Sequence, residues 1–246
     1  MKLFILAAGK GERLMPLTKD IPKSLIDLGD GSTMISRQIQ KAERSGIFDE
    51  IIVITGYRAA QIRNAIDEKQ RDIRISFVHN PYYCISNNLM SMWTAHFLMR
   101  GNDFMITNGD NVYLTDVYNS VYTDTREIIQ LTIDFKWKYD TDDMKVCLDS
   151  KNRVVRVSKD LPPVETHAES VGLALVRGER SREIFVNTLL ELASDPGHMN
   201  SFWLEIFNEL HSRGISLESA VIESDDWIEI DFHPDIEAIR KIVLGK

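Results

Sequence analysis

The sequence has few of the features that mark secreted, zinc-binding or membrane-spanning proteins. It holds two cysteines, Cys84 and Cys147, which lie far apart and form no CxxC motif. This spacing argues against a disulfide framework or a zinc site and predicts buried free thiols in a reducing compartment. No apolar run is long enough to span a membrane, and the first residues lead into a strand-like stretch without a hydrophobic leader. We therefore expect a cytoplasmic protein without membrane insertion.

A basic excess is missing as well. The net charge is -8, whereas nucleic-acid-binding proteins usually present a basic face, so no nucleic-acid partner is expected. A few local cations can still bind the phosphates of a small molecule in an acidic protein. The 246 residues, 43% of them hydrophobic, are enough for a sizeable core. The oligomeric state stays open, a homodimer included, because exposed apolar surface cannot be read from a sequence.

Strand and helix patterns alternate through the first 110 residues. Short apolar runs bounded by glycine or polar residues predict strands, and apolar residues at helical spacing predict helices. The predicted strands cover residues 3–7, 50–56, 75–80 and 103–110, and the predicted helices cover residues 32–45, 58–66 and 89–99. This alternation indicates βαβ units and a parallel sheet that is covered on both faces.

The pattern changes after Asp116 to longer, more alternating strands with a turn at Lys151-Asn152. Two helices at 181–193 and 201–213 follow, then a strand pair within 219–231 and a terminal helix with Pro234 near its start. No linker divides the chain. We predict a single domain of residues 1–246 with a three-layer α/β/α Rossmann-like fold, in which a mostly parallel central sheet carries a mixed-sheet lobe.

A glycine-rich loop, "LAAGKGERLMPLTKDIPK" from Leu6 to Lys23, follows the first predicted strand. Open α/β sheets bind ligands at this end of their strands, and bare glycine amides can point at phosphate oxygens. A dinucleotide motif does not fit, because position 14 is leucine and Pro16 and Pro22 exclude the helix that should follow. No Gly-Lys-Ser/Thr closes a Walker A loop. From the residues alone, a phosphate loop and a surface turn with scattered cations both remain open.

The full string L-A-A-G-x-G-x-R-L-x-P-L-T-x-x-x-P-K resembles the signature of nucleotidyltransferases that join a nucleoside triphosphate to a phosphorylated small molecule. The resemblance implies a nucleotide-binding half, residues 1–115, and an acceptor-binding half, residues 116–246. It also implies that Lys23 and Arg13 are catalytic. The nucleotide-binding residues that it implies are Leu6, then Ala7, Ala8 and Gly9 at the base and ribose, Gly11 and Arg13 at the β- and γ-phosphates, and Lys23 between the α-phosphate and the attacking phosphate.

Three acidic residues are candidate ligands for Mg²⁺, which such a reaction needs because two phosphate anions must approach each other. Asp110 follows an apolar strand, while Glu229 and Asp231 alternate along another and share one face. A turn-forming aspartate and a solvated strand face are the simpler interpretations. The resemblance implies that Asp110 also contacts the nucleotide and, with Asp231, binds the metal, with Glu229 as a further candidate.

A polar loop with Ser86, Asn87 and Asn88 precedes the third predicted helix. Its amides could face a nucleotide base, cap the helix, or do both. The pattern N-x-x-Y-x-x-S-N-N-x-x-S-x-W resembles small cytidylyltransferases that use CTP to activate phosphocholine or aminoalkylphosphonates such as 2-aminoethylphosphonate. That branch implies a position near the phosphates for Lys159, which makes it a third catalytic candidate, and an exposed lysine at a strand end is the alternative interpretation. Phe232 departs from its pattern, which has threonine there.

The acceptor pocket is the part that the sequence defines least. An ammonium group binds aromatic faces and carboxylates. The candidates are Tyr82, Tyr83, Trp93, Trp137, Tyr139, Asp140, Asp142, Trp203, Glu205 and Trp227. The alternatives are a sugar-1-phosphate nucleotidylyltransferase using UTP, dTTP or GTP, a non-catalytic nucleotide-binding regulatory subunit, and an NAD-dependent dehydrogenase. The missing glycine-rich "G-T-A" segment argues against the first of these.

Overall fold

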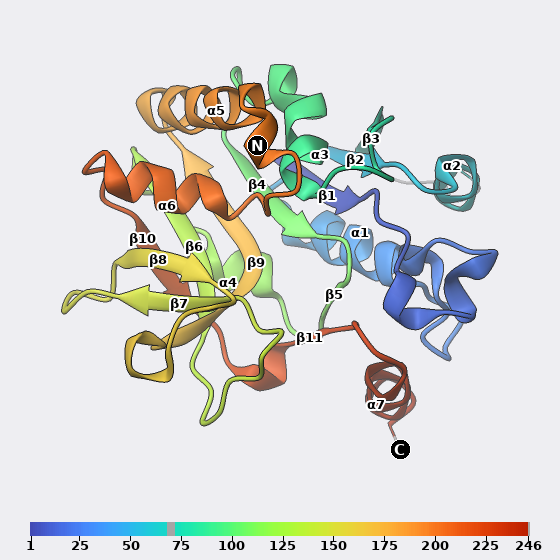
Figure 1. Ribbon diagram of the computed structural model, residues 1–246. Coiled ribbons are helices and arrows are strands. Elements are labelled where there is room, and N and C mark those ends of the chain that lie inside the picture. Colours follow the sequence, from blue (N-terminus) through green and yellow to red (C-terminus); the bar gives the residue numbers. More distant parts are fainter. Residues whose placement is uncertain (68–71, 246) are drawn as a thin grey trace.

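The structure, a computed structural model that describes residues 1–67 and 72–245, is built in three layers around a central sheet (Figure 1). The main strand order is β10-β6-β9-β4-β1-β2-β3. These strands are β1 (Lys2–Ala7), β2 (Glu50–Thr55), β3 (Arg74–His79), β4 (Phe104–Asn108), β6 (Ile128–Asp134), β9 (Ala168–Arg177) and β10 (Glu218–Val221).

Strands β4, β1, β2 and β3 are parallel, as the alternating pattern predicts. Their register brings Leu6 opposite Asn108 and Ala7 opposite Thr55. The carboxyl ends of β1 and β4 therefore lie together, and the segments that follow them leave the sheet at the same edge. This edge is where a parallel sheet places its ligand site.

Helices cover both faces of the sheet because each carries an apolar stripe. The first face is covered by α3 (Asn88–Ala95), α5 (Glu179–Ser194) and α6 (Glu205–Ser212), which share one core cluster. The opposite face is covered by α1 (Met34–Ser45), α2 (Ala59–Asp67) and α4 (Val117–Val121), which share a second cluster. The three-layer α/β fold with a mostly parallel central sheet is thereby confirmed.

The second half of the chain continues the same sheet through β9, which is antiparallel to both β4 and β6. A hairpin of β7 (Lys145–Leu148) and β8 (Val154–Ser158) pairs with β9 through β7. Its turn includes Asn152 with φ of 58°, a conformation that asparagine tolerates. The turn predicted at Lys151-Asn152 is confirmed.

The predicted strand pair within 219–231 is wrong in its pairing. Both strands form, but β10 is parallel to β6, whereas β11 (Trp227–Glu229) is antiparallel to β5 (Asn111–Tyr113) in a separate two-stranded sheet. The reason is long-range: Ile222 donates its N–H to Ile133 and keeps the first strand at the central sheet. Local patterns identify strands but do not identify their partners.

Two helix boundaries also differ from the prediction. The last full helix of the first half ends at Ala95 and continues only as a 3₁₀ turn, and α6 begins at Glu205 instead of residue 201. The segment before α6 is held elsewhere, because Asn87 N–H donates to the Met199 carbonyl and Leu89 N–H to that of Ser201. Tertiary hydrogen bonds thus replace the first turn of the predicted helix.

The prediction of two buried free thiols is wrong for burial. Both cysteines are free, but Cys84 is exposed and Cys147 is half-buried. Cys84 lies in the loop between β3 and α3 and is not part of a core cluster. Separately, none of the helices in the described ranges is long and apolar enough to cross a membrane.

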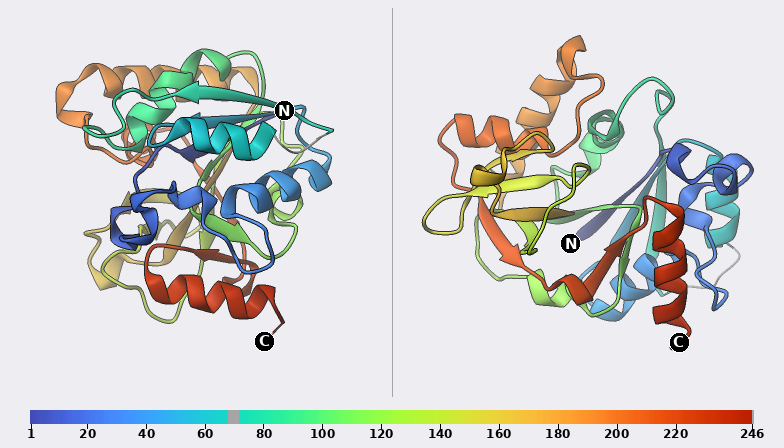
Figure 2. Two further views of the ribbon diagram at one scale, coloured as in Figure 1. Left: turned by 90° about the vertical axis from the view of Figure 1, so that its right-hand side faces the viewer. Right: turned by 60° about the horizontal axis from the view of Figure 1, so that its bottom comes forward.

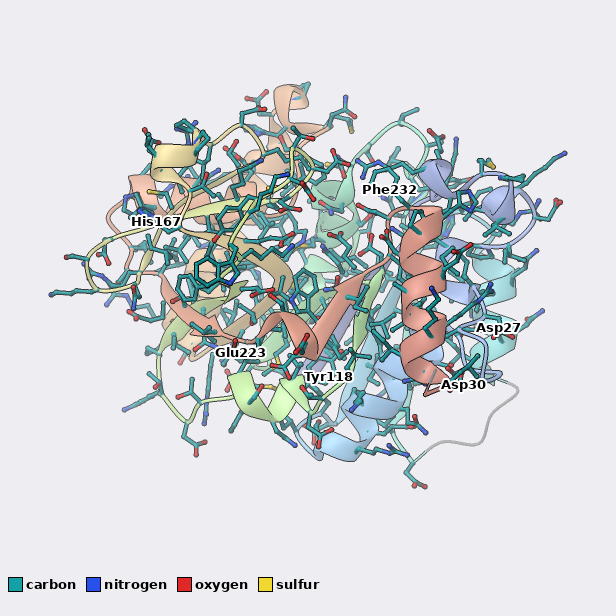
Figure 3. The ribbon with its side chains drawn as sticks, turned by 90° about the horizontal axis from the view of Figure 1, so that it is seen from below. Asp27, Asp30, Tyr118, His167, Glu223 and Phe232 are labelled. Carbon is teal, nitrogen blue, oxygen red and sulfur yellow. The ribbon has the colours of Figure 1, made fainter. Side chains whose placement is uncertain are left out.

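A third core cluster includes a residue of the glycine-rich loop and so anchors the loop to the rest of the chain. It joins Leu14 of the loop and Val112 of β5 to Ile230 beside β11 and Ile236 of α7 (His233–Val243). In both views of Figure 2, the red α7 lies beside the blue loop region. Figure 3 shows Asp27, just after this loop, near α7, and Arg240 of α7 donates a hydrogen bond of 2.8 Å to its carbonyl oxygen. The two ends of the sequence are thus packed against each other.

Candidate functional site

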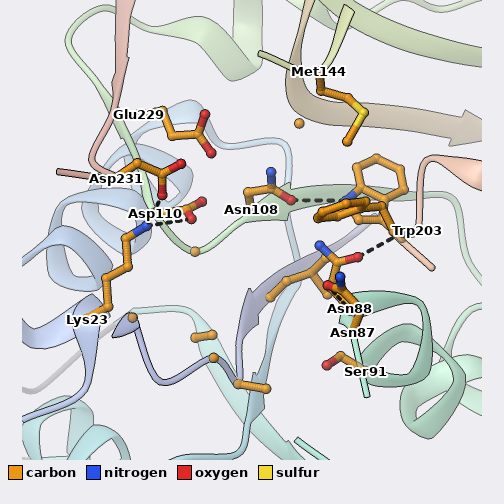
Figure 4. Close-up of a pocket in the computed structure, with 18 of the residues that line it drawn as sticks. Lys23, Asn87, Asn88, Ser91, Asn108, Asp110, Met144, Trp203, Glu229 and Asp231 are labelled. Atoms are coloured by element: carbon orange, nitrogen blue, oxygen red, sulfur yellow. Dashed lines mark hydrogen bonds and ion pairs between the residues drawn. The ribbon is translucent and has the colours of Figure 1, made fainter. Parts of the chain in front are cut away.

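A pocket of about 470 Å³ opens at the carboxyl ends of β1 and β4. Its size suits a small-molecule ligand. Figure 4 shows its two sides, an ionic cluster around Lys23 and an amide-rich wall around Trp203. The residues that the sequence predicts for catalysis, nucleotide binding and metal binding all line this pocket: Leu6, Ala7, Ala8, Gly9, Gly11, Arg13, Lys23, Ser86, Asn87, Asn88, Asp110, Lys159, Glu229 and Asp231.

Gly11 fixes the path of the loop over Lys23. Its φ of 66° is left-handed, and an added Cβ would lie 2.9 Å from the Cβ of Lys23. The hydroxyl of Thr18 donates a hydrogen bond of 2.7 Å to the Gly11 carbonyl, and the Leu14 side chain is buried in the third cluster. Only glycine combines this backbone angle with so close an approach. The loop therefore brings Lys23 into the pocket at a fixed position.

Lys23 forms the centre of the ionic cluster. Its Nζ lies 2.9 Å from Asp110 Oδ2 and 2.7 Å from Asp231 Oδ1, which joins the loop to β4 and β11. Burial alone lowers the pKa of Lys23, but attraction to the two carboxylates outweighs burial and raises this pKa above its usual range. Lys23 is therefore a permanently charged group in the pocket.

Three carboxylates converge beside Lys23. One oxygen from each of Asp110, Glu229 and Asp231 lies within 4.8 Å of the others. Burial, followed by repulsion from Asp110 and Asp231, raises the pKa of Glu229 well above its usual value. Burial also opposes ionisation of Asp231, but the charge of Lys23 outweighs it and lowers that pKa. The cluster thus holds more negative charge than one lysine neutralises.

This cluster fits a divalent cation with a preference for oxygen ligands. Within residues 1–67 and 72–245, Asp110 Oδ1 is buried without a hydrogen-bond partner, which a metal ligand would explain. Mg²⁺ binds carboxylate oxygens in this way, often through one or two carboxylates together with substrate phosphates. Asp110, Glu229 and Asp231 are therefore the residues that would hold it.

Arg13 and Lys159 approach the cluster from opposite halves of the chain. Arg13 Nη1 lies 2.8 Å from Asp142 Oδ2 and 2.9 Å from Asp231 Oδ2. Lys159 Nζ lies 4.0 Å from the other oxygen of Asp142. Asp231 thus contacts both Lys23 and Arg13, and Asp142 lies between Arg13 and Lys159, so the pocket gathers three cations, which suits a polyphosphate.

The opposite wall consists of amides around Trp203. Asn87 caps α3 by accepting the N–H of Asn88, so the capping interpretation is correct and the residue still lines the pocket. The side-chain oxygen of Asn88 accepts the backbone N–H of Trp203 at 2.8 Å, and that of Asn108 accepts its indole N–H at 3.0 Å.

The sequence analysis did not identify Asn108 or Gly172, which packs against the Asn108 side chain. Gly172 has φ of 69°, and a Cβ there would lie 2.2 Å from the amide nitrogen of Asn108. The signal was present in "TNGD", where Asn108 directly precedes the ligand edge. Because this segment is rich in turn-forming residues, the sequence did not show that the Asn108 side chain lines the pocket.

Of the ten candidates for the acceptor side, three line the pocket: Tyr83, Asp142 and Trp203. Trp137 is fully exposed at 108%. The pocket adds residues that sequence reasoning did not single out, among them Ser24, Met144, Ser170 and Phe202. They come from four separate segments, so no local pattern groups them.

The chain matches a family model and several known proteins. The profile of the family described as "Nucleotidyl transferase" matches residues 2–141. The chain is 26% identical to the bifunctional protein GlmU of Methanococcus aeolicus over 88% of its own length, and it spans 49% of that protein.

Two further relatives are matched over nearly their whole length. The CTP:phosphoglutamine cytidylyltransferase of Campylobacter jejuni is 25% identical, over 96% of this chain and 98% of that protein. The 2-aminoethylphosphonate cytidylyltransferase of Lancefieldella rimae is 26% identical, over 95% and 89%.

A solved structure agrees with the fold. The CTP:phosphocholine cytidylyltransferase of Streptococcus pneumoniae matches with a TM-score of 0.75 and 19% identity, over 98% of both chains. The three-layer arrangement around the mostly parallel sheet is therefore shared with that protein.

Proposed function

The chain belongs to the nucleotidyl transferase family, and we propose that within it the chain is a Mg²⁺-dependent cytidylyltransferase. It joins CTP to a phosphocholine-like or aminoalkylphosphonate acceptor and releases pyrophosphate. The observation that carries this proposal is the position of Lys23, between the glycine-rich loop and the carboxylates Asp110 and Asp231.

In the proposed reaction, an oxygen of the acceptor phosphate or phosphonate attacks the α-phosphorus of CTP. The new P–O bond forms as the bond from the α-phosphorus to the bridging oxygen of the β-phosphate breaks, and pyrophosphate leaves with the electron pair. Mg²⁺ bound to the carboxylates would neutralise charge on the phosphates.

The chain's own residues position and neutralise the reactants. The amides of the loop around Gly11, with Arg13, hold the two departing phosphates. Lys23 stabilises the negative charge between the α-phosphate and the attacking group. Lys159, which belongs to the acceptor-binding half of the chain, binds near the phosphates from the other side. No proton has to be removed from an acceptor that attacks as an ionised phosphate, so positioned cations carry the catalysis.

The choice of CTP is supported by the two cytidylyltransferases that this chain matches almost end to end. Other relatives are named as uridylyltransferases, so the nucleotide is part of the proposal. A lysine and three carboxylates lie together in one pocket. A non-catalytic regulatory subunit does not need such a cluster for its role, so the cluster favours an enzyme.

Pyrophosphate release tests the proposal directly. CTP, UTP, GTP, ATP and dTTP are each combined with Mg²⁺ and one acceptor: phosphocholine, phosphoethanolamine, 2-aminoethylphosphonate, glycerol phosphate or glucose 1-phosphate. We expect turnover with CTP and an amine-bearing acceptor. Turnover confined to glucose 1-phosphate with another nucleotide would refute the cytidylyltransferase assignment and favour the sugar-phosphate alternative.

A further inference from the structure

Trp203 fixes which way two pocket amides face. Its backbone N–H donates to Asn88 Oδ1 and its indole N–H to Asn108 Oδ1. Both groups of Trp203 can only donate, so each asparagine must turn its oxygen toward Trp203 and its NH₂ group away. Rotating either amide by 180° would set two donors against each other.

The anchor for Asn88 is itself rigid. Trp203 is fully buried, and the segment before it is bound to the start of α3 through the N–H groups of Asn87 and Leu89. Asn88 therefore cannot exchange its donor for an acceptor without breaking this contact. The pocket presents a fixed hydrogen-bond donor at this position.

The two NH₂ groups have different surroundings. That of Asn108 lies against Gly172, where an added Cβ would be 2.2 Å away. That of Asn88 has no hydrogen-bond partner in residues 1–67 and 72–245, and Figure 4 shows it pointing away from Trp203, on the side where the ionic cluster lies. Asn88 is the amide that is free to bind a ligand.

The resemblance to nucleotidyltransferases implies that the base lies at Ala7, Ala8 and Gly9, which line the same pocket as Asn88. The loop that leads to Asn88 contains Tyr83, which packs beside the end of β1. At Gly56, an added Cβ would lie 2.6 Å from the Ala8 carbonyl oxygen and 2.6 Å from the Cβ of Tyr83. Tyr83, Ala8 and Asn88 all line the pocket.

We propose that Asn88, held as an obligatory donor by the backbone N–H of Trp203, selects cytosine over uracil. This inference rests on the proposed function. Cytosine offers two neighbouring acceptors, O2 and N3, on the edge by which proteins read an extruded base. Uracil carries a hydrogen on N3, which would face the NH₂ group of Asn88. Leaving a donor unsatisfied in this way costs enough to give about a 10- to 100-fold preference for CTP.

Asn88→Asp tests the proposal because it changes chemistry and little else. The aspartate keeps one oxygen for the N–H of Trp203 and places an acceptor where the NH₂ group was. Affinities for CTP and UTP are measured by calorimetry in the presence of Mg²⁺, without an acceptor substrate. The added negative charge weakens both nucleotides alike, so the ratio of their dissociation constants isolates the base. We expect the preference for CTP to fall at least tenfold.

Asn108→Asp is the matched control. It makes the same change at the other amide held by Trp203, and its altered atom faces Gly172 instead of the base. We expect weaker binding of both nucleotides with an unchanged CTP to UTP ratio. If Asn88→Asp does not fold, Asn88→Ala replaces it, and the ratio should then approach one because the donor is gone.

The outcomes separate the two proposals. An unchanged ratio in a folded Asn88 variant, with a wild-type protein that prefers CTP, overturns the role of Asn88 alone. An equal fall of the ratio in Asn108→Asp also overturns it, since the effect would then come from charge. A wild-type protein that prefers UTP overturns the proposed function itself.

Discussion

Replacing Lys23 with methionine tests the centre of the site. Methionine keeps an unbranched side chain of similar length and removes the charge that neutralises Asp110 and Asp231, at 2.9 and 2.7 Å. In the proposed reaction this charge also stabilises the transition state. Loss of one preorganised electrostatic contact of this kind costs about 3–4 kcal/mol, so we expect kcat to fall about 100- to 1000-fold.

The same change should strengthen metal binding. Without Lys23, three carboxylates whose ligand atoms lie within 4.8 Å of each other lose their nearest cation. A gain of about 1.4 kcal/mol would tighten Mg²⁺ binding about tenfold. At saturating Mg²⁺, this gain should enlarge the metal-induced rise in melting temperature by about 3–6 °C for a chain of this size.

The assays are pyrophosphate release for turnover, and differential scanning fluorimetry with and without Mg²⁺ for the metal. Lys41→Met is the matched control, because it removes the same charge from an ion pair with Asp116 that lies outside the pocket. It should leave turnover and the Mg²⁺ shift unchanged. Wild-type turnover in Lys23→Met, or an Mg²⁺ shift equal to that of the wild type, would refute this account of the cluster.

Three further predictions concern Gly172 and Asp142, which line the pocket, and Glu169, which is buried in β9. Gly172→Ala should lower both turnover and melting temperature, because the position has φ of 69° and the new methyl group would displace Asn108. Gly101→Ala is the control and should change neither quantity, since no atom lies within 4 Å of an added Cβ there. Equal effects of the two substitutions would contradict this prediction. Burial outweighs the attraction of Lys136 and raises the pKa of Glu169 to about 7. The folded state then binds more protons than the unfolded state above pH 4.5, so urea denaturation should show stability falling by up to about 3 kcal/mol as pH rises from 4.5 to 7, and Glu169→Gln should flatten this slope. Asp142→Asn removes the carboxylate that lies 2.8 Å from Arg13, so the KM for CTP should fall severalfold; a higher KM would mean that Asp142 aids nucleotide binding.

Local sequence was sufficient for most of the first half of the fold. Apolar runs ending in glycine marked β1 and β2, and helical spacing marked α1, since both elements are stabilised by one face that the residues themselves define. It was insufficient for β10 and β11, where the partner strands lie far away in the sequence. It also placed Cys84 in the interior, because hydrophobic character does not reveal which loops reach a core.

The same division holds for the site. The sequence by itself determined the glycine-rich loop and its cations, because a turn of this kind is formed by consecutive residues. It also marked Asp110 and Asp231 as acids at strand ends. Only the tertiary structure decided that Lys23 lies between these two carboxylates, and that Trp203 holds the amides of Asn88 and Asn108. These contacts join segments more than 80 residues apart, and their geometry depends on how the whole sheet is assembled.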